Sequence, residues 1–316
     1  MSELEELLRA KARQLLAEGQ VQQVIGYERG TVPLRARPCF VRDPEQVERL
    51  VWNPHCENNL ATYLHQADGK VAIVAKGCDA RSIVNEIVER QVPRGDVVII
   101  GVPCQGVVDR RKVEELLDGR DAFDGQITQG HLVIHGTDFE ESVELQAVWN
   151  DSCATCRHRN PPVYDILIGE LVEAEDGEDV YVAVRELEAK TADERWAYFS
   201  SEFSRCIRCY ACRQACPSCY CPECFVDQTQ PSWFAKSDEL SDVMAFHLVR
   251  AYHVAGRCLD CGACARACPM GIDLRTLSRK LQKDVRELFD YEPGMDVEAA
   301  PALGSYRQDD SDKFIK

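Results

Sequence analysis

The sequence predicts an α/β N-terminal domain with a parallel-containing sheet, followed by a mainly α-helical domain that is dense in cysteine. Two observations predict this division. Short apolar runs alternate with helical patterns up to about residue 118, and most of the 17 cysteines lie beyond residue 200. Alternating strands and helices favour a parallel sheet with helices on its faces, so the first part should be an α/β domain.

The changes in composition also predict domain boundaries. We expect an N-terminal helical segment with its lead-in, an α/β domain, a helical domain and an extended acidic tail, at residues 1–50, 51–200, 201–290 and 291–316. The opening segment MSELEELLRAKARQLLAEG predicts an amphipathic helix. One side of this helix should carry Leu4, Leu7, Leu8, Leu15 and Leu16.

Two strand–turn–helix units follow. The apolar runs 71–75 and 97–102 are too short for helices and rich in β-branched residues, as buried strands are. Apolar residues then recur at helical spacing after each run. The pattern predicts at least two parallel strands. Cys78 and Cys104 each lie where a strand ends, so both should reach the carboxyl edge of the sheet, where open α/β sheets place their ligands.

The rest of the first domain reads as strands and one loop. Residues 131–149 alternate in polarity, as half-exposed strands do. Asn160-Pro161-Pro162 enforces an irregular loop after Cys153 and Cys156, which leaves this Cys-x2-Cys pair free to bind a metal. The pieces 166–174 and 180–187 look like strands separated by the acidic turn Glu175–Glu178. Further along, residues 238–255 have a helical pattern closed by Gly256.

Composition excludes several classes of protein. A formal net charge of −16 disfavours nucleic acid as a partner, because phosphate backbones are bound through clusters of Lys and Arg. No stretch approaches the roughly 18 consecutive apolar residues of a membrane span, so we expect no direct membrane insertion. The N-terminus has no apolar signal region, and the many cysteines then indicate a reducing, cytoplasmic location.

The most informative motif is a Cys-x2-Cys-x2-Cys-x3-Cys-Pro run that occurs twice, at residues 206–217 and 258–269. In two-cluster ferredoxins of this pattern, three thiolates of each run hold one 4Fe-4S cluster and the fourth reaches the other cluster. The predicted ligands are Cys206, Cys209, Cys212 and Cys268 for one cluster, and Cys258, Cys261, Cys264 and Cys216 for the other. Structural zinc or disulfides are the alternatives.

Nine cysteines remain outside the predicted ligand sets. Cys78, Cys104, Cys153 and Cys156 fall in contexts that could converge on a third 4Fe-4S cluster, although Cys78 and Cys104 could equally be buried structural cysteines. Cys219, Cys221 and Cys224 follow a cluster ligand directly. They could form a further metal site with Cys56, but the favoured reading is that they line a cluster pocket.

Other candidate residues carry weaker signals. None of the seven histidines forms a metal-binding pair, so packing or surface roles are expected for all of them. The basic triplet Arg157-His158-Arg159 could hold an anionic cofactor such as a flavin diphosphate, with a solvated turn as the favoured reading. The usual glycine-rich dinucleotide and nucleophile motifs are absent from the sequence.

Three segments carry a resemblance to a known family. VAIVAKGCDARSIV, VVIIGVPCQG and CATCRHRNPPVYDILIG resemble core motifs of the beta subunit family of deazaflavin-dependent hydrogenases and formate dehydrogenases, over about residues 50–200. This resemblance implies cluster ligands at Cys78, Cys104, Cys153 and Cys156, and FAD as a cofactor. The segment HVAGRCLDCGACARACPMGIDL resembles the helical ferredoxin domains of heterodisulfide reductase C subunits.

Two functional hypotheses follow from these resemblances. The first is a non-catalytic iron-sulfur electron-transfer subunit of an anaerobic oxidoreductase complex, whose partners are other subunits of that complex. The second is a flavin-containing oxidoreductase subunit that exchanges hydride with a deazaflavin or nicotinamide and feeds the clusters. In the second hypothesis, FAD would lie near Gly77 and Arg157.

Overall fold

The computed structural model describes residues 3–173, 180–305 and 308. They divide into two compact units. The first comprises the described residues of Met1–Ala80 and Val92–Gly177, and the second those of Arg81–Gln91 and Glu178–Lys316. The domain boundaries expected from composition stay predictions.

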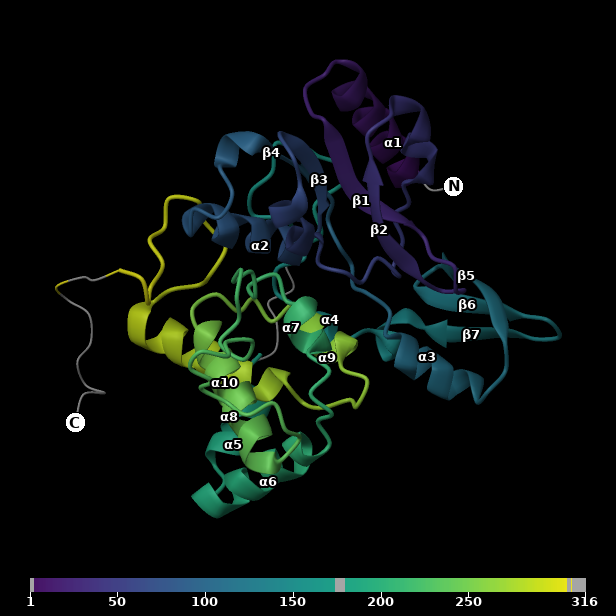
Figure 1. The fold of residues 1–316 in the computed structure, drawn as a ribbon. Coiled ribbons are helices and arrows are strands. Elements are labelled where there is room, and N and C mark those ends of the chain that lie inside the picture. The colour runs from purple at the N-terminus through teal and green to yellow at the C-terminus, as the bar shows by residue number, and fades with distance from the viewer. Residues whose placement is uncertain (1–2, 174–179, 306–307, 309–316) are drawn as a thin grey trace. The chain divides into compact units, whose positions relative to one another are not determined.

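The first unit is built on a mixed five-stranded sheet (Figure 1). Its order is β2-β1-β3-β4-β8, in which β1, β3, β4 and β8 are parallel and β2 is antiparallel to β1. The strands are β1 (Gln23–Arg29), β2 (Ala36–Val41), β3 (Val71–Ala75), β4 (Val97–Gly101) and β8 (Ile166–Leu167). The prediction of an α/β region with parallel strands is confirmed.

Burial explains why these runs form strands. All five residues of β3 are buried, and Ile73 pairs with the equally buried Ile99 of β4. A strand covered on both faces reads as a continuous apolar run, which β3 does. Helix α1 (Glu3–Ala17) buries Leu8, Ala12 and Leu15, but Leu7 is 49% exposed. The placement of Leu7 on the apolar side was therefore wrong.

The first unit also contains a small antiparallel sheet. Its strands β5 (Ala122–Thr128), β6 (His131–Gly136) and β7 (Glu140–Glu144) pair in sequence order. The alternating pattern at 131–149 predicted β6 and β7 but not β5, and its end forms a 3-10 helix. Helix α3 (Arg110–Leu117) shares a core with β6. The short helices are α4 (Asp151–Ala154) and the 3-10 helices η1 (Pro44–Arg49), η2 (Leu60–Gln66), η3 (Arg94–Asp96) and η4 (Leu145–Val148).

Helix α2 (Gly77–Val88) starts one residue after β3 ends. Its first four residues belong to the first unit and the remainder to the second. Within the second unit, Asn85 Nδ2 donates to the Arg257 carbonyl oxygen at 2.8 Å, and Arg81 Nη2 donates to the Pro293 carbonyl oxygen at 2.8 Å. The helix thus contributes polar contacts to the cysteine-rich part of the chain.

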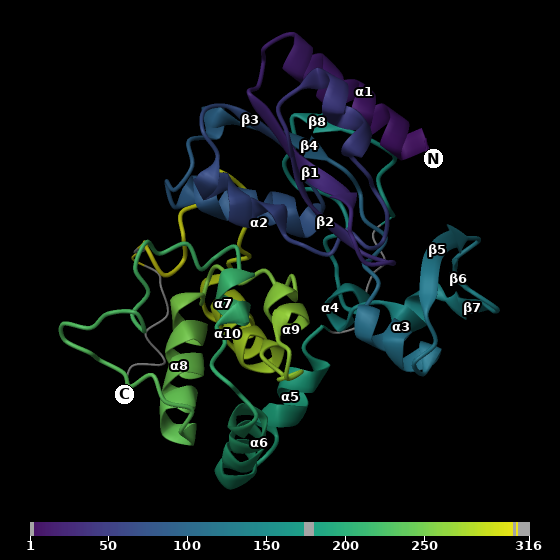
Figure 2. The same ribbon diagram turned by 45° about the vertical axis from the view of Figure 1, so that its right-hand side comes forward.

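Helices supply the regular structure of the second unit's described residues (Figure 2). They are α5 (Val182–Glu188), α6 (Ala192–Ser204), α7 (Ala211–Gln214), α8 (Leu240–His253), α9 (Ala263–Ala267) and α10 (Arg275–Phe289). The expected helix at 238–255 is confirmed by α8. Phe203, Val243 and Phe246 form a core with Cys212 and Cys268, so two cysteines of the repeated run lie inside the packing.

One predicted strand is wrong. The segment 180–187 alternates apolar residues and was expected to be a strand, but Val182–Glu188 form α5. Val184 and Leu187 are buried three residues apart, at helical spacing, and Lys283 of α10 pairs with Glu188 at 2.9 Å. Packing against α10 therefore decides the conformation. The predicted acidic turn Glu175–Glu178 lies outside the described residues.

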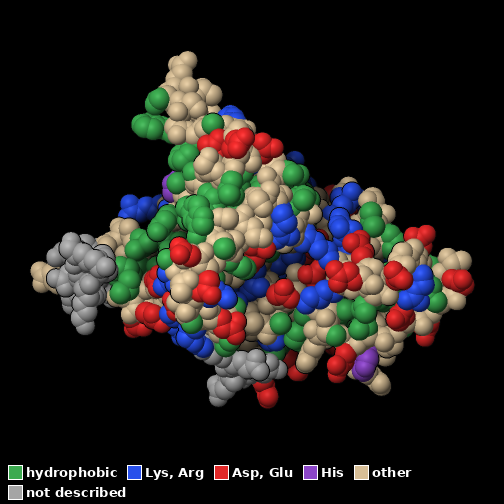
Figure 3. All heavy atoms as spheres, turned by 90° about the horizontal axis from the view of Figure 1, so that it is seen from below, with side chains coloured by type: hydrophobic (Ala, Val, Ile, Leu, Met, Phe, Trp, Pro, Cys, Tyr) green, Lys and Arg blue, Asp and Glu red, His purple; other side chains and the backbone are tan. Residues whose placement is uncertain are grey.

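No helix among the described residues is long and apolar enough to cross a membrane. The face in Figure 3 carries acidic and basic side chains interspersed with one another.

Candidate iron-sulfur sites

The two cysteine runs adopt the same backbone conformation. Arg208 and Tyr210 have φ of 49° and 60°, and the residues at the same offsets in the second run, Asp260 and Gly262, have φ of 54° and 73°. A short helix follows in each run, α7 and α9. Left-handed residues within a turn direct backbone N–H groups toward a common point, which is how many iron-sulfur sites hold their anionic cluster.

The first pocket, which we call site 1, is lined by Cys206, Cys209, Cys212 and Cys268. Three of these thiols come from the first run and the fourth from the second, the crossed arrangement that the spacing predicts. The backbone N–H of Arg208 donates to Cys206 Sγ at 3.4 Å. Such a bond favours the thiolate over the thiol, and the thiolate is the form that binds iron.

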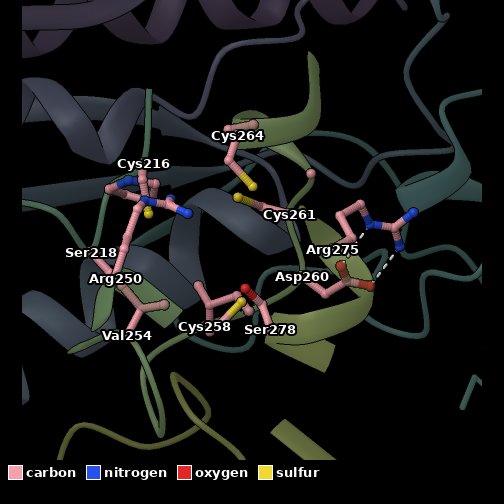
Figure 4. A pocket seen from close by; sticks show the side chains of 14 residues that line it. Cys216, Ser218, Arg250, Val254, Cys258, Asp260, Cys261, Cys264, Arg275 and Ser278 are labelled. Carbon is pink, nitrogen blue, oxygen red and sulfur yellow. Dashed lines mark hydrogen bonds and ion pairs between the residues drawn. The ribbon is translucent and has the colours of Figure 1, made fainter. Parts of the chain in front are cut away.

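The second pocket, site 2, is lined by Cys216, Cys258, Cys261 and Cys264. Figure 4 shows these four side chains arranged around the same space. Here the first run supplies one thiol and the second run three. Arg275 fixes the segment between Cys258 and Cys261, which contains Asp260. Its Nε and Nη2 donate to the two carboxylate oxygens of Asp260 at 2.8 and 2.7 Å.

The two sites differ in their exposure. At site 1, Cys209 is exposed, and its neighbours Ile207 and Met270 are 58% and 38% exposed. At site 2, all four cysteines are at least partly buried. Cys212 and Cys268 of site 1 are buried, so only the Cys209 side of that site comes near the surface.

Burial opposes ionisation of the thiols in both sites. It raises the pKa of Cys212 to about 12 and that of Cys261 to about 11. The free thiols would therefore stay protonated near pH 7, whereas a coordinated thiol is deprotonated outright. Loading iron should accordingly release protons.

The cysteines of the first unit, Cys78, Cys104, Cys153 and Cys156, form the candidate site 3. Cys78 lies in the first turn of α2 and Cys104 in the loop after β4, so both follow strand ends as predicted. The backbone N–H of Cys104 donates to the Arg159 carbonyl oxygen at 2.9 Å, which ties this loop to the segment that follows Cys156.

Electrostatics also link the thiols of site 3. The pKa of Cys104 is raised to about 12, mainly by burial and then by the nearby Cys153 and Cys156 thiols. Lys76 is buried beside them, and its pKa is raised by the Asp79, Tyr27 and Cys78 groups despite burial, which opposes its charge. Lys76 Nζ lies 2.8 Å from Asp79 Oδ2, so its charge is already balanced within the first unit.

The two residues named for a flavin have different surroundings. A Cβ atom added at Gly77 would lie 2.0 Å from the His158 carbonyl oxygen, so this glycine is needed for the loop to pack on α2. The His158 backbone therefore occupies the space next to Gly77, and no room is left there for a cofactor. Arg157 is exposed.

Cys56, Cys219, Cys221 and Cys224 have different surroundings within their own units. Cys56 is buried in the first unit, with its Sγ accepting from Asn53 N at 3.5 Å. A hydrogen bond between the Cys216 and Cys219 side chains raises the pKa of Cys216 and lowers that of Cys219. Cys224 packs partly buried against the core of the second unit, and Cys221 is exposed.

Two side chains of α8 lie at the cysteine sites and were missed by sequence reasoning. His247, expected to have a packing or surface role, lies with Nε2 3.4 Å from Cys206 Sγ, and Arg250 lines site 2. Residues three apart on a helix share a face, but the distance of that face from the cysteines depends on tertiary packing. Among the described residues, no three His, Cys, Asp or Glu side chains are grouped so that they could hold a single metal ion. A 4Fe-4S cluster is larger and is held by four separate thiolates.

Comparison with known proteins agrees with the cysteine pattern. Residues 202–272 match the model of the 4Fe-4S dicluster domain. The F420-dependent formate dehydrogenase subunit beta of Methanocaldococcus jannaschii is 25% identical, over 93% of this chain and 92% of that protein. The F420-dependent formate dehydrogenase 1 subunit beta of Methanococcus maripaludis is 27% identical, over 92% of this chain and 90% of that protein.

A solved structure shows a weaker likeness. The F420-reducing [NiFe] hydrogenase complex from Methanosarcina barkeri contains a chain that aligns with 48% of this chain and 59% of its own length, at 17% identity and a TM-score of 0.38. The two formate dehydrogenase subunits and the dicluster domain confirm the resemblance found in the sequence. The chain is an iron-sulfur electron-transfer subunit, and its sequence is similar to those of the beta subunits of F420-dependent formate dehydrogenases.

Proposed function

We propose that this chain relays single electrons through three 4Fe-4S clusters within an oxidoreductase complex. One observation carries the proposal. The two pockets of the second unit are each lined by four cysteines, in the crossed sets that a two-cluster ferredoxin uses. A disulfide framework or isolated structural cysteines would not require this exchange of one thiol between the runs.

The proposed ligands follow the pockets. Site 1 takes Cys206, Cys209, Cys212 and Cys268, site 2 takes Cys216, Cys258, Cys261 and Cys264, and site 3 takes Cys78, Cys104, Cys153 and Cys156. A bound cluster accepts and gives one electron at a time. The chain's own contribution is to hold the thiols, to donate backbone hydrogen bonds such as that from Arg208 to Cys206, and to keep water away from site 2.

The third cluster rests on the surroundings of Cys104. Its loop is tied to Arg159, and the Cys153 and Cys156 thiols are close enough to raise its pKa. The relatives suggest the partners. They are subunits of F420-dependent formate dehydrogenases, so we propose that this chain assembles with other subunits of a comparable redox complex in the cytoplasm.

A flavoprotein subunit that exchanges hydride with a deazaflavin is the second candidate, and the names of the relatives favour it. In that case FAD would feed the clusters. The packing at Gly77 gives it no support at that position, although Arg157 remains accessible. A further metal site at Cys219, Cys221, Cys224 and Cys56 is the weakest of the proposals.

Anaerobic purification followed by iron, sulfide and flavin quantitation tests these alternatives together. Three clusters correspond to about 12 iron and 12 sulfide per chain, and two clusters to about 8 of each. We expect the higher count, with broad visible absorbance that dithionite bleaches. Stoichiometric flavin released on denaturation would establish the second candidate. Zinc without sulfide would refute both.

A further inference from the structure

Helix α8 places two buried polar side chains at the two cysteine sites of the second unit. His247 and Arg250 are 4% and 6% exposed and lie one turn apart on this helix. Neither belongs to the repeated cysteine runs. Their position matters because hydrogen bonds and charges next to cluster thiolates are the means by which a protein sets a cluster's reduction potential.

The imidazole of His247 is fixed against site 1. Its ring stacks on Phe203, with centroids 4.5 Å apart and an angle of 18°, and it is tilted at 60° to Phe246 at 4.9 Å. Nε2 lies 3.4 Å from Cys206 Sγ. A cluster thiolate can only accept at this distance, so the neutral ring must carry its proton on Nε2 and donate it. The two phenyl rings leave the imidazole little freedom to turn away.

The guanidinium of Arg250 is buried between the two sites. Nη2 donates to the carbonyl oxygen of Cys212, a site 1 residue, at 3.1 Å, while the side chain lines site 2 (Figure 4). The groups that raise its pKa are all thiols, led by Cys216 and Cys264 of site 2. Burial opposes its charge.

Arg250 has no carboxylate to balance that charge. The groups around its guanidinium are thiols instead, and among the described residues its Nε has no hydrogen-bond partner. One of these thiols is Cys219, whose pKa is lowered by hydrogen bonds with Cys216 and with Arg250. A buried cation is stabilised by negative charge next to it. An anionic cluster in site 2, with a second in site 1, would supply such charge.

We propose that α8 sets the reduction potentials of the two clusters, through the hydrogen bond from His247 to Cys206 at site 1 and through the positive charge of Arg250 at site 2. The inference rests on the proposed cluster ligands. Reduction adds one electron to a cluster and breaks no bond. Because the reduced cluster is one unit more negative, a donor hydrogen bond and a fixed cation both stabilise it more than the oxidised form, and both potentials are raised.

The test is an anaerobic redox titration of the full chain, followed by EPR, with iron content measured on every sample. His247→Phe keeps the aromatic stack and removes the donor. We expect the equilibrium constant for reduction of one cluster to fall about tenfold, which is about 59 mV for one electron, with the other cluster unchanged. His247→Gln, which restores a donor, should recover most of the shift. His253→Phe, an exposed histidine on the same helix, is the matched control and should change neither potential.

Arg250→Met should lower mainly the potential of the site 2 cluster, which His247→Phe leaves unchanged. The equilibrium constant for reduction of that cluster should fall about tenfold or more. Arg250→Lys, which keeps the positive charge, should keep the wild-type potential. Wild-type potentials in His247→Phe and Arg250→Met at full iron content would overturn the proposal, as would an equal shift of both clusters in His247→Phe. If Arg250→Met binds less iron, Arg250→Lys must restore it, since a role in packing alone would not depend on charge. Wild-type protein without iron would instead refute the proposed function.

Discussion

The buried ion pair between Lys76 and Asp79 is the most tightly enclosed charge pair of the first unit. Their side chains are 3% and 0% exposed, and Lys76 Nζ lies 2.8 Å from Asp79 Oδ2. Lys76 Nζ also donates to the Asn58 carbonyl oxygen at 3.0 Å, and Asp79 accepts from the backbone N–H of Leu60 at 3.1 Å. These bonds connect the residue after β3 to the segment before η2. They hold the first turn of α2, and with it Cys78, in place.

Replacing Lys76 by Met should destabilise the protein strongly. The change leaves the Asp79 carboxylate buried without its partner, which costs about 3–5 kcal/mol. The midpoint of thermal or urea unfolding, followed by circular dichroism on iron-loaded protein, measures the effect. Arg110→Met is the matched control, since it breaks an exposed pair with Glu114 and should cost less than about 1 kcal/mol. Equal effects of the two substitutions would show that Lys76 is not engaged in the buried pair.

At the scale of elements, the repeated Cys-Pro run determines a local backbone conformation as well as the predicted ligands. The left-handed residues 208, 210, 260 and 262 and the short helices α7 and α9 recur at the same offsets, so each run folds as a copy of the other. The crossing of one thiol between the copies then requires the two runs to pack together. Contacts between α7 and α9 fulfil this requirement.

The crossing predicts which cluster each cysteine supports. Cys216 belongs to the first run but lines site 2, so Cys216→Ala should remove the cluster of the second run and leave that of the first. Iron content should fall by about four atoms per chain, and EPR should lose one of the reduced signals. Loss of the site 1 cluster instead would contradict the crossed assignment.

Cys219 provides the control for that substitution. It is hydrogen-bonded to Cys216 and its pKa is lowered, so it is the nearest thiol that could replace the missing ligand. Cys219→Ser alone should keep full iron, because Cys219 does not line either pocket. If Cys216→Ala keeps its cluster and the double substitution loses it, Cys219 has taken over as ligand.

The start of α10 predicts a pH dependence. Asp273 Oδ1 accepts from Arg275 N and Thr276 N, each at 3.1 Å, and Oδ2 accepts from the Tyr198 hydroxyl at 2.6 Å. Burial alone would raise the pKa of Asp273, but these hydrogen bonds lower it below its usual value. A lowered pKa in the folded state means that the carboxylate stabilises the fold above the unfolded pKa, and that this stabilisation is lost as the pH falls through the folded pKa.

Asp273→Ala should therefore lower the unfolding temperature at neutral pH, through loss of its hydrogen bonds to Arg275, Thr276 and Tyr198, each worth about 0.5–1.5 kcal/mol. The difference from wild type should stay constant from pH 8 to pH 5 and shrink only below about pH 4, where the wild-type carboxylate takes up a proton. Thermal scans of both proteins in matched buffers measure it. A difference that shrinks between pH 8 and pH 6 would point to another titrating group.

At the scale of the whole molecule, the sequence patterns predicted those features that depend on residues close together in the chain. The spacing of the cysteines gave both crossed sets, and the β-branched runs gave β3 and β4, because these features depend on neighbours along the chain. The helix α5 and the positions of His247 and Arg250 depend on partners that lie far away in sequence. Val182 and Val184 alternate like a strand, and only α10 makes a helix the better solution. Sequence therefore predicted which cysteines line the two pockets, but not that His247 and Arg250 lie beside them.

The division into two units predicts that the clusters can be lost independently. Site 3 is formed within the first unit, and sites 1 and 2 within the second. Cys153→Ala removes one thiol of site 3 without touching the core around Cys212 and Cys268. Iron should fall by about four atoms per chain, while the two potentials assigned through His247 and Arg250 keep their wild-type values. An iron content equal to that of the wild type would reject the third cluster. The crossed pockets would then still account for about eight iron atoms per chain. In that case the relay would consist of the two clusters of the second unit.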